Sequence, residues 1–284
     1  MNRKIVFLDI DGTLSINNRV PLSAKIACRE ARKNGHILYI CTGRARLQVS
    51  PSIVNIGFDG IISSGGAYIE TALNAEDGGK LLFNAVIEPE KLSVLISYFN
   101  ERKAAYTLEL TDKLIAGPYL KSYFDGYYKG RTFTLRRLAE QFFLHQIFKK
   151  CEWDYGNSER GDVRKLVFWE SDGVTFEDAV RDFGSSHELF HLSIPVAGMT
   201  GGEICPLGVH KGTALEKVSA YHGFERADTI AFGDSDNDRM MIQSAGLGVA
   251  MGNSVDSLKE TADDIADSIE NNGLAKAFKK YGLI

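Results

Sequence analysis

Four short polar segments contain most of the side chains that are suited to chemistry. The first is Asp9-Ile10-Asp11-Gly12-Thr13-Leu14, directly after the apolar run Ile5-Val6-Phe7-Leu8. The other three are Cys41-Thr42-Gly43-Arg44, Val209-His210-Lys211-Gly212 and Gly233-Asp234-Ser235-Asp236-Asn237-Asp238. Three of the four follow strand-like stretches, and the Lys211 segment is expected to open a helix. Because ligands of open α/β sheets bind beyond the carboxyl ends of the strands, these distant segments are predicted to lie together in space.

Asp9 and Asp11 place two carboxylates two positions apart at the end of a predicted strand. A carboxylate can attack a phosphoryl group and form an aspartyl-phosphate, which divides a difficult hydrolysis into two easier displacements. We therefore predict that Asp9 is the nucleophile. Asp11 is close enough to reach the other side of the phosphorus, where it would protonate the leaving alkoxide and then deprotonate the attacking water.

A carboxylate and a phosphate repel each other, so this attack needs a cation. Oxygen ligands together with water select Mg²⁺. The predicted protein ligands are Asp9, Asp234 and the main-chain oxygen of Asp11. Asp238 is expected either to bind the metal directly or to lie just behind the ligands.

Negative charge also develops on the equatorial oxygens of a transferring phosphoryl group, and positioned donors supply most of the catalysis. Lys211 offers a cation for this purpose, and the Thr42 hydroxyl and the Gly43 amide offer hydrogen-bond donors. The amide of Asn237 is a further candidate donor. Arg44 follows the Thr-Gly pair, and the sequence leaves open whether it contacts the substrate or joins an ion pair.

Alternating strand-like and helix-like stretches surround these segments. Ser23 is a candidate N-cap for the first helix, and Gly35 would end it. The βαβαβ order predicts an α/β fold with a doubly wound parallel sheet. Strands are predicted at residues 5–8, 37–40, 60–67, 229–232 and 247–250, and helices at residues 24–34, 45–55, 212–222, 238–245 and 255–262.

The pattern changes between about residues 83 and 206, which predicts a second α/β module inserted into the first. We predict a discontinuous core domain of residues 1–83 and 200–284 and a cap domain of residues 84–199. Within the cap, helices are predicted at residues 89–102, 135–150 and 176–183, strands at 166–169 and 188–194, and an aromatic-rich segment at 119–131.

Composition limits the classes of partner. The 284 residues are 44% hydrophobic, and the net charge of −4 comes without a long block of either sign. This disfavours a nucleic-acid-binding surface and favours a small-molecule ligand. The four cysteines lack metal-binding or redox spacing, as in reduced cytosolic proteins. The apolar run at residues 5–8 is too short for a signal peptide or a membrane span, so a soluble, cytoplasmic protein is expected.

Two further patterns have ordinary alternatives. His187-Glu188-Leu189-Phe190-His191 matches a zinc motif that works only on a helix. The alternating apolar residues there predict a strand, on which the two histidines would stand roughly 13 Å apart, too far for one zinc ion. The aromatic and basic residues of segment 119–131 would either bind a phosphorylated sugar or flat cofactor, or pack within the cap with their cations solvated, and the second is favoured.

Taken together, the four segments resemble those of the haloacid dehalogenase (HAD)-like superfamily of phosphohydrolases, specifically the Cof-type subfamily IIB. The family pattern is D-x-D-G-T-L, T-G-R, a Lys-Gly pair and G-D-x-x-N-D, followed by A-G-x-G-V-A-M-G-N, which is nearly intact at residues 245–253. The resemblance covers both core segments and also the length and position of the insertion. Two positions depart from it, since Gly65 stands where the family often has Asn and His210 where Ser is frequent.

The resemblance implies a Mg²⁺-dependent phosphatase with a Rossmann-like core. Asp9 would be the nucleophile, Asp11 the acid and base, Thr42 and Lys211 phosphate ligands, and Asp234 a metal ligand. The expected substrate is a small phosphorylated metabolite, either a sugar phosphate or a phosphorylated cofactor such as flavin mononucleotide or pyridoxal phosphate, and the cap would select the leaving group.

Two alternatives use the same aspartyl-phosphate. A phosphotransferase or phosphomutase would pass the phosphoryl group to a sugar hydroxyl instead of water, as in phosphomannomutase relatives, depending on how well water is excluded. A non-enzymatic phospho-acceptor module would signal through a partner, but such a module has no need of Asp11 or of a cap. A dehalogenase is disfavoured, because carbon–halogen displacement requires no Mg²⁺ site.

Overall fold

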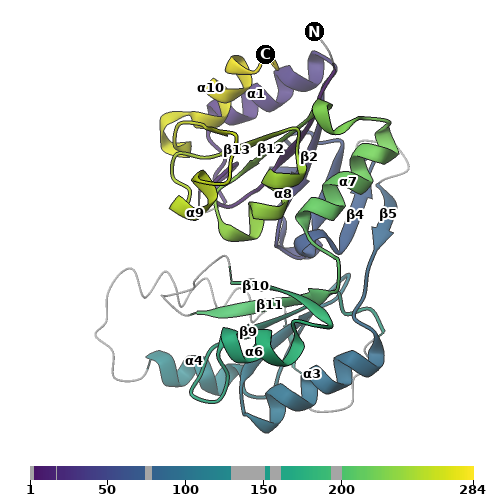
Figure 1. The fold of residues 1–284 in the computed structure, drawn as a ribbon, viewed down its shortest axis with the longest axis vertical. Coiled ribbons are helices and arrows are strands. Elements are labelled where there is room, and N and C mark those ends of the chain that lie inside the picture. Colours follow the sequence, from purple (N-terminus) through teal and green to yellow (C-terminus); the bar gives the residue numbers. More distant parts are fainter. Residues whose placement is uncertain (1–2, 17, 74–78, 129–150, 154–160, 193–199) are drawn as a thin grey trace. The chain divides into compact units, whose positions relative to one another are not determined.

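The computed structural model describes residues 3–16, 18–73, 79–128, 151–153, 161–192 and 200–284 (Figure 1). They form two compact units, a first unit of Met1–Asn84 and Gly208–Ile284 and a second unit of Ala85–Leu207. The insertion ends later than the predicted residue 199. The reason is that β11 (Gly201–Pro206) pairs on its two edges with β9 (Lys165–Trp169) and β10 (His187–His191) of the second unit.

The first unit is built on an eight-stranded sheet in the order β14-β13-β12-β1-β2-β3-β4-β5. β1 (Ile5–Leu8) lies in the middle and pairs in parallel with β12 on one side and β2 on the other. The chain builds outward from β1 in one direction and returns on the other side, so the strand order reverses between β1 and β12. The remaining strands are β2 (Ile37–Cys41), β3 (Gly60–Ser63), β4 (Tyr68–Thr71), β5 (Lys80–Asn84), β12 (Thr229–Gly233), β13 (Leu247–Ala250) and β14 (Asp264–Ile265).

Helices cover both faces of this sheet, which explains why its central strands are continuously apolar. α1 (Leu22–Lys33) and α10 (Gly273–Lys280) pack on the face that receives Val6 and Leu8. On the opposite face, α7 (Lys211–His222) and α8 (Arg239–Ser244) share a core with Ile5 and Phe7. The two helix pairs are visible in Figure 1. The predicted doubly wound α/β fold is confirmed.

Several predicted local features of the first unit differ from the structure. The strand expected at residues 60–67 ends at Ser63, and the helix expected at residues 255–262 is the short α9 (Asp256–Lys259). α1 begins at Leu22, so Ser23 lies in the first turn, where its hydroxyl donates to Asn272 Oδ1 (2.6 Å) instead of capping the helix. The single helix expected at residues 45–55 is a 3₁₀ turn, Arg46–Gln48, followed by the short α2 (Pro51–Val54). Pro51 has no amide hydrogen to continue a helix from the preceding turn, so it can only start a new one.

The second unit has a six-stranded sheet in the order β10-β11-β9-β6-β7-β8. α3 (Pro89–Glu101) and α6 (Phe176–Phe183) pack on one face, and α4 (Leu120–Tyr128) packs on the other. The helix predicted at residues 135–150 lies outside the described residues. The strands are β6 (Ala105–Glu109), β7 (Leu114–Ala116), β8 (Cys151–Trp153), β9 (Lys165–Trp169), β10 (His187–His191) and β11.

The zinc-like motif of the sequence forms β10, as its alternation predicts. His187 and His191 stand at the two ends of this strand, which pairs antiparallel with β11. A zinc site of the helical kind, which the sequence already disfavoured, is therefore excluded for these two histidines. Part of the aromatic-rich segment forms α4, where Phe124 is buried against Trp169, in agreement with a packing role.

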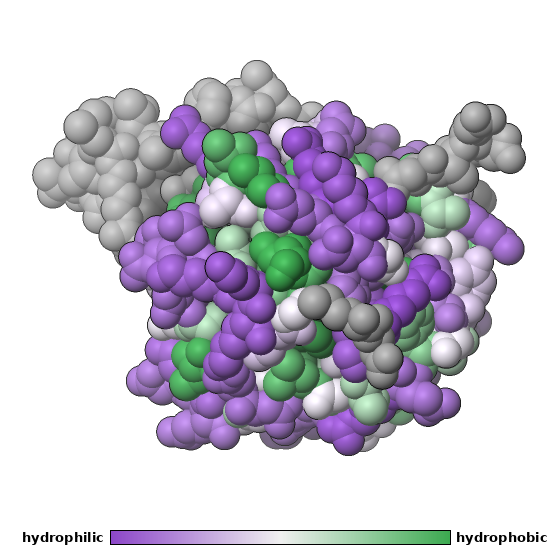
Figure 2. Space-filling view, turned by 90° about the horizontal axis from the view of Figure 1, so that it is seen from above, coloured by the Kyte–Doolittle hydropathy of each residue, from purple (hydrophilic) through white to green (hydrophobic). Residues whose placement is uncertain are grey.

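The described surface carries mixed polarity. Hydrophilic residues dominate the face drawn in Figure 2, and hydrophobic residues are interspersed among them. Leu22 and Ile26 of α1 are examples of exposed apolar side chains, and scattered residues of this kind are normal on globular proteins. No helix in the described parts of the chain has the length and apolar character needed to cross a membrane.

Candidate active site

The carboxyl ends of β1 and β12 lie side by side and carry the first two aspartates of the site. Register pairs Leu8 with Phe232, and the amide of Asp9 donates to the carbonyl of Phe232 (3.1 Å). Side chains alternate between the faces of a strand, so Asp9 follows Ile5 and Phe7 toward the α7 side. Asp234 follows β12 directly, which brings the two carboxylates to one edge of the sheet.

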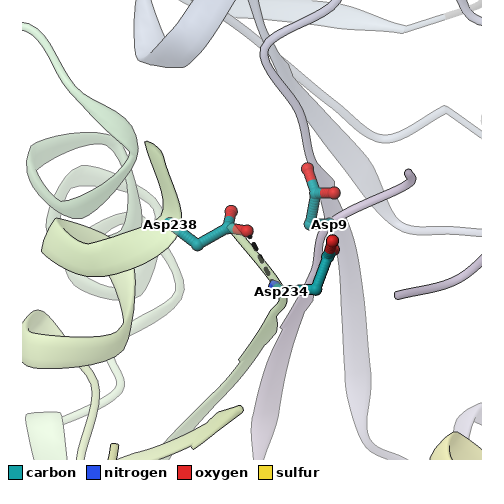
Figure 3. A group of neighbouring side chains, drawn as sticks. All are labelled: Asp9, Asp234 and Asp238. Atoms are coloured by element: carbon teal, nitrogen blue, oxygen red, sulfur yellow. Dashed lines mark hydrogen bonds between the residues drawn. The ribbon is translucent and has the colours of Figure 1, made fainter. Parts of the chain in front are cut away.

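Three carboxylates converge at this edge. One oxygen from each of Asp9, Asp234 and Asp238 lies within 4.8 Å of the others. Figure 3 shows Asp238 projecting from the start of the next helical segment toward the strand ends that carry Asp9 and Asp234. Asp238 Oδ2 accepts hydrogen bonds from the amides of Asp234 (3.0 Å) and Ser235 (3.2 Å), so it also fixes the turn after β12.

Lys211 supplies a buried cation to this group. It is the first residue of α7, and its side chain is only 1% exposed. Its Nζ donates to Asp9 Oδ1 (2.7 Å) and Asp238 Oδ1 (2.5 Å) and lies 3.4 Å from Asn237 Oδ1. Since Lys211 and two amides occupy both oxygens of Asp238, this carboxylate is arranged to hold Lys211 and the turn. The two expected places of Asp238, on the metal ion or just behind its ligands, both stay predictions.

Asp234 is held from the opposite side by a hydroxyl. Thr13 Oγ donates to Asp234 Oδ1 (2.8 Å), and Lys211 contacts Oδ1 of Asp9. Each of these contacts uses one lone pair, so both carboxylates keep lone pairs that can bind a cation. An all-oxygen donor set of this kind fits a hard divalent ion.

The electrostatics of the site also favour a cation. Burial raises the pKa of Asp9 well above its ordinary value, although Lys211 acts in the opposite direction. Burial, followed by the nearby Asp238, raises the pKa of Asp234 to about 7. Burial alone would lower the pKa of Lys211, but Asp238 and Asp9 outweigh it and raise that pKa. Three carboxylates therefore share one ammonium group, and a divalent cation would balance the excess negative charge.

This excess charge predicts a pH-dependent response to Mg²⁺. The folded pKa of Asp234, about 7, exceeds the unfolded value of about 3.9, so the folded state favours the protonated carboxyl. The stability from this group is complete below the unfolded pKa and is lost as the pH rises through the folded pKa. Mg²⁺ competes with that proton. We expect Mg²⁺ to raise the Tm of EDTA-treated protein more at about pH 8 than at about pH 5.5 in scanning calorimetry.

Asp234→Asn is the control for this measurement, because its amide neither ionises nor binds Mg²⁺ well. The variant should lose most of the Mg²⁺ response at both pH values. An equal rise in Tm at both pH values in the unmodified protein would contradict the prediction.

Asp11 is engaged by an arginine rather than by the acidic cluster. Arg44 Nε donates to Asp11 Oδ2 (2.7 Å), and its Nη2 donates to Oδ1 (2.5 Å). The Nη1 of Arg44 donates to Asn18 Oδ1 (2.6 Å). Of the two roles that the sequence left open for Arg44, the structure contains the ion pair.

The other predicted phosphate ligands lie on the neighbouring elements. Thr42 and Gly43 follow β2. Ile40 of β2 pairs in register with Leu8 of β1, so both strands end at the same edge of the sheet. Thr42 is buried, and its Oγ accepts a hydrogen bond from the amide of Arg44 (3.2 Å). Asn237 Oδ1 accepts from Ser235 Oγ (2.9 Å) beside Lys211. The sheet therefore brings all four predicted segments to one edge of the first unit.

Thr13, Gly12 and Asn253 make contacts in the site that the sequence did not predict, although a sharp turn at Gly12 and Thr13 was expected. Gly12 has φ +83°, and a Cβ atom there would lie 2.2 Å from Asp234 Oδ2, so only glycine fits. Asn253 Nδ2 donates to the carbonyl of Gly12 (2.8 Å), while its Oδ1 accepts from the amide of Ile269 (3.0 Å). All three residues belong to the family motifs quoted above. The chemistry of their side chains, however, did not predict which residues they contact.

The two departures from the family pattern lie near the start of α7. Gly66, beside Gly65, has φ +114°, and a Cβ atom there would lie 2.6 Å from the carbonyl oxygen of His210. His210 Nδ1 accepts a hydrogen bond from the amide of Thr213 (3.2 Å) and so caps the helix in place of a serine. This cap fixes the turn from which Lys211 extends into the site.

Comparison with known proteins agrees with this geometry. A family model described as haloacid dehalogenase-like hydrolase matches residues 6–278. The chain belongs to this family. The HAD-like hydrolase resembles two solved structures over almost its whole length. A haloacid dehalogenase-like hydrolase from B. subtilis has a TM-score of 0.80 at 22% identity, with coverage of 97% of this chain and 99% of that one. The HAD subclass IIB sugar phosphatase BT4131 has a TM-score of 0.76 at 22% identity, with coverage of 99% and 100%.

A curated relative from Bacillus subtilis (strain 168) is the 5-amino-6-(5-phospho-D-ribitylamino)uracil phosphatase YcsE. It is 27% identical over 286 residues, which are 99% of this chain and 96% of the relative. The predicted family resemblance is thus confirmed. The HAD-like hydrolase is a phosphatase that acts on phosphoric monoesters.

Proposed function

We propose that this HAD-like hydrolase is a Mg²⁺-dependent phosphomonoesterase that forms an aspartyl-phosphate on Asp9. The observation that carries the proposal is the arrangement of Asp9, whose Oδ1 is held by Lys211 within a cluster of three carboxylates. Lys211 uses one lone pair of the Asp9 carboxylate, which keeps others for nucleophilic attack and for cation binding. The cluster lies at the point where the strand order of the sheet reverses, which is where open α/β sheets bind ligands.

The residues of the chain have distinct roles in the proposed reaction. Asp9 attacks the phosphorus, and the leaving oxygen takes a proton from Asp11. In the second displacement, Asp11 accepts a proton from water, which attacks the phosphorus and releases Asp9 and inorganic phosphate. Lys211 holds Asp9 in place. Mg²⁺, when bound, would reduce the repulsion between the carboxylate and the phosphate.

The remaining residues of the site bind the phosphoryl oxygens and the cation. We propose that the Thr42 hydroxyl, the Gly43 amide and the Asn237 amide donate hydrogen bonds to the phosphoryl oxygens. Asp234 and the main-chain oxygen of Asp11 would complete the protein ligands of Mg²⁺, with Asp238 behind them. This assignment is supported by the common edge of the sheet from which all these groups extend.

The proposed substrate is the phosphate ester of a polyhydroxylated chain, either a sugar or a ribityl group. The relative YcsE is named for a ribityl phosphate and BT4131 for sugar phosphates. Flavin mononucleotide also carries a ribityl phosphate and is the first cofactor to test, with pyridoxal phosphate next. Selection of the leaving group by the inserted second unit stays a prediction from the sequence.

Phosphate release from a substrate panel tests the proposal. The panel contains sugar phosphates, flavin mononucleotide, pyridoxal phosphate and nucleotides, each assayed with Mg²⁺ and with EDTA. We expect release from at least one sugar or ribityl phosphate in Mg²⁺ and its loss in EDTA. Release that is unchanged by EDTA would contradict the metal dependence. Transfer of the phosphoryl group to a sugar hydroxyl without release would favour the phosphotransferase alternative.

A further inference from the structure

We propose that Arg44 is a positioning residue for Asp11, and that it serves the general acid rather than the phosphate. The proposal rests on the proposed function, and specifically on the acid role of Asp11. It decides between the two roles that the sequence left open for Arg44. The guanidinium would hold the carboxyl group that transfers a proton to the leaving group.

The first observation is the geometry of the ion pair. Arg44 donates from Nε and Nη2 to the two separate oxygens of Asp11, at 2.7 and 2.5 Å. Two parallel hydrogen bonds of this kind fix the plane of a carboxylate as well as its position. The Arg44 side chain is 13% exposed and that of Asp11 is 32% exposed, so the pair is partly protected from water.

The second observation is that Arg44 is anchored at both ends. Its carbonyl accepts a hydrogen bond from the amide of Ser64 (2.8 Å), and its amide donates to Thr42 Oγ, which fixes the backbone between β2 and β3. Its third nitrogen, Nη1, donates to Asn18 Oδ1 (2.6 Å), and Asn18 has φ +62° in the turn that follows Asp11. Through Nε, Nη1 and Nη2, the guanidinium therefore connects the loop that contains Asp11 and Asn18 to the segment that follows β2.

This arrangement is compatible with proton transfer by Asp11. A carboxylate offers about four lone-pair sites, and the two hydrogen bonds from Arg44 occupy one on each oxygen. The second lone pair of either oxygen can carry the proton that goes to the leaving group. If Arg44 were to bind the phosphate with the same fork, it would have to release Asp11 and leave the acid without its support. One arginine is thus unable to perform both functions at once with these atoms.

The leaving group provides a test that separates the two functions. An alkoxide leaves only with a proton, whereas p-nitrophenolate is stable enough to leave without one, so general acid catalysis matters far more for alkyl phosphates. We compare kcat/KM, because it reports the steps up to the transfer of the phosphoryl group to Asp9. For Arg44→Ala we expect a fall of about 10²-fold with the best sugar phosphate of the panel and of less than about tenfold with p-nitrophenyl phosphate.

Arg46→Ala is the matched control. Arg46 lies two positions along the chain and pairs with a different carboxylate, Glu70, through Nε (2.5 Å). Its replacement removes a similar ion pair from the same segment, and we expect the ratio of the two kcat/KM values to stay unchanged. Arg44→Lys restores the charge without the fork and is expected to recover only part of the alkyl phosphate activity. Added guanidinium ion should partly rescue Arg44→Ala with the sugar phosphate.

The possible outcomes distinguish this inference from the proposed function. Equal losses for both substrates in Arg44→Ala would overturn the inference and would assign Arg44 to the phosphate. If Asp9→Asn hydrolysed p-nitrophenyl phosphate as fast as the unmodified protein, the proposed function itself would be wrong. The inference about Arg44 would then be wrong as well. A selective loss with the alkyl substrate, together with guanidinium rescue, would support the positioning role.

Discussion

Asp9→Asn is expected to lower kcat/KM for every substrate by about 10⁴-fold or more. The carboxamide has nearly the same shape and its oxygen can still accept the hydrogen bond from Lys211, but it is not a nucleophile for phosphorus. The measurement is phosphate release at saturating Mg²⁺ with the best substrate of the panel. A calorimetric scan of the same variant checks that the loss is chemical rather than a loss of folding.

Asp228→Asn is the control for this variant. Asp228 forms an ion pair with Lys4 (3.0 Å) in the same unit, with its side chain 33% exposed and without a place in the site. Surface pairs of this partly exposed kind contribute between zero and about 1 kcal/mol. Turnover by Asp228→Asn should match that of the unmodified protein. Turnover by Asp9→Asn within about tenfold of the original would exclude Asp9 as the nucleophile.

Lys211→Met is expected to remove activity and also to lower the free energy of unfolding by about 3–5 kcal/mol in EDTA. Methionine fills a similar volume but leaves Asp9 and Asp238 buried without their shared cation. Because Mg²⁺ would balance the same charges, we expect its addition to recover part of the lost stability. Denaturant unfolding with and without Mg²⁺ measures both effects.

Lys165→Met provides a control of the same chemical kind in the second unit. Lys165 is also 1% exposed and lies between two carboxylates, 3.1 Å from Glu203 and 3.5 Å from Glu109. Its replacement should cost comparable stability, but Mg²⁺ should give no recovery beyond that of the unmodified protein. If Mg²⁺ recovered both variants equally, the cation would not be acting at the Lys211 cluster.

The sequence predicted the central elements of the first unit well, because each is signalled by local pattern. Continuous apolar runs became β1, β2 and β12, which are buried on both faces. The prediction failed at residues 45–55, where apolar spacing resembled a helix but Pro51 interrupts the backbone hydrogen bonds. It also ended the insertion too early, because nothing in the local pattern of β11 shows which sheet the strand will join.

For the site, the sequence determined which groups are available and on which elements they lie. An apolar strand followed by aspartate places a carboxylate at the edge of a sheet, so Asp9 and Asp234 followed from local order alone. Only the tertiary structure decided which groups contact one another. Lys211 is shared between Asp9 and Asp238, and Arg44 is committed to Asp11. Such contacts join distant residues, such as Lys211 and Asp9, which lie 202 positions apart, and they depend on register and burial, which no local pattern encodes.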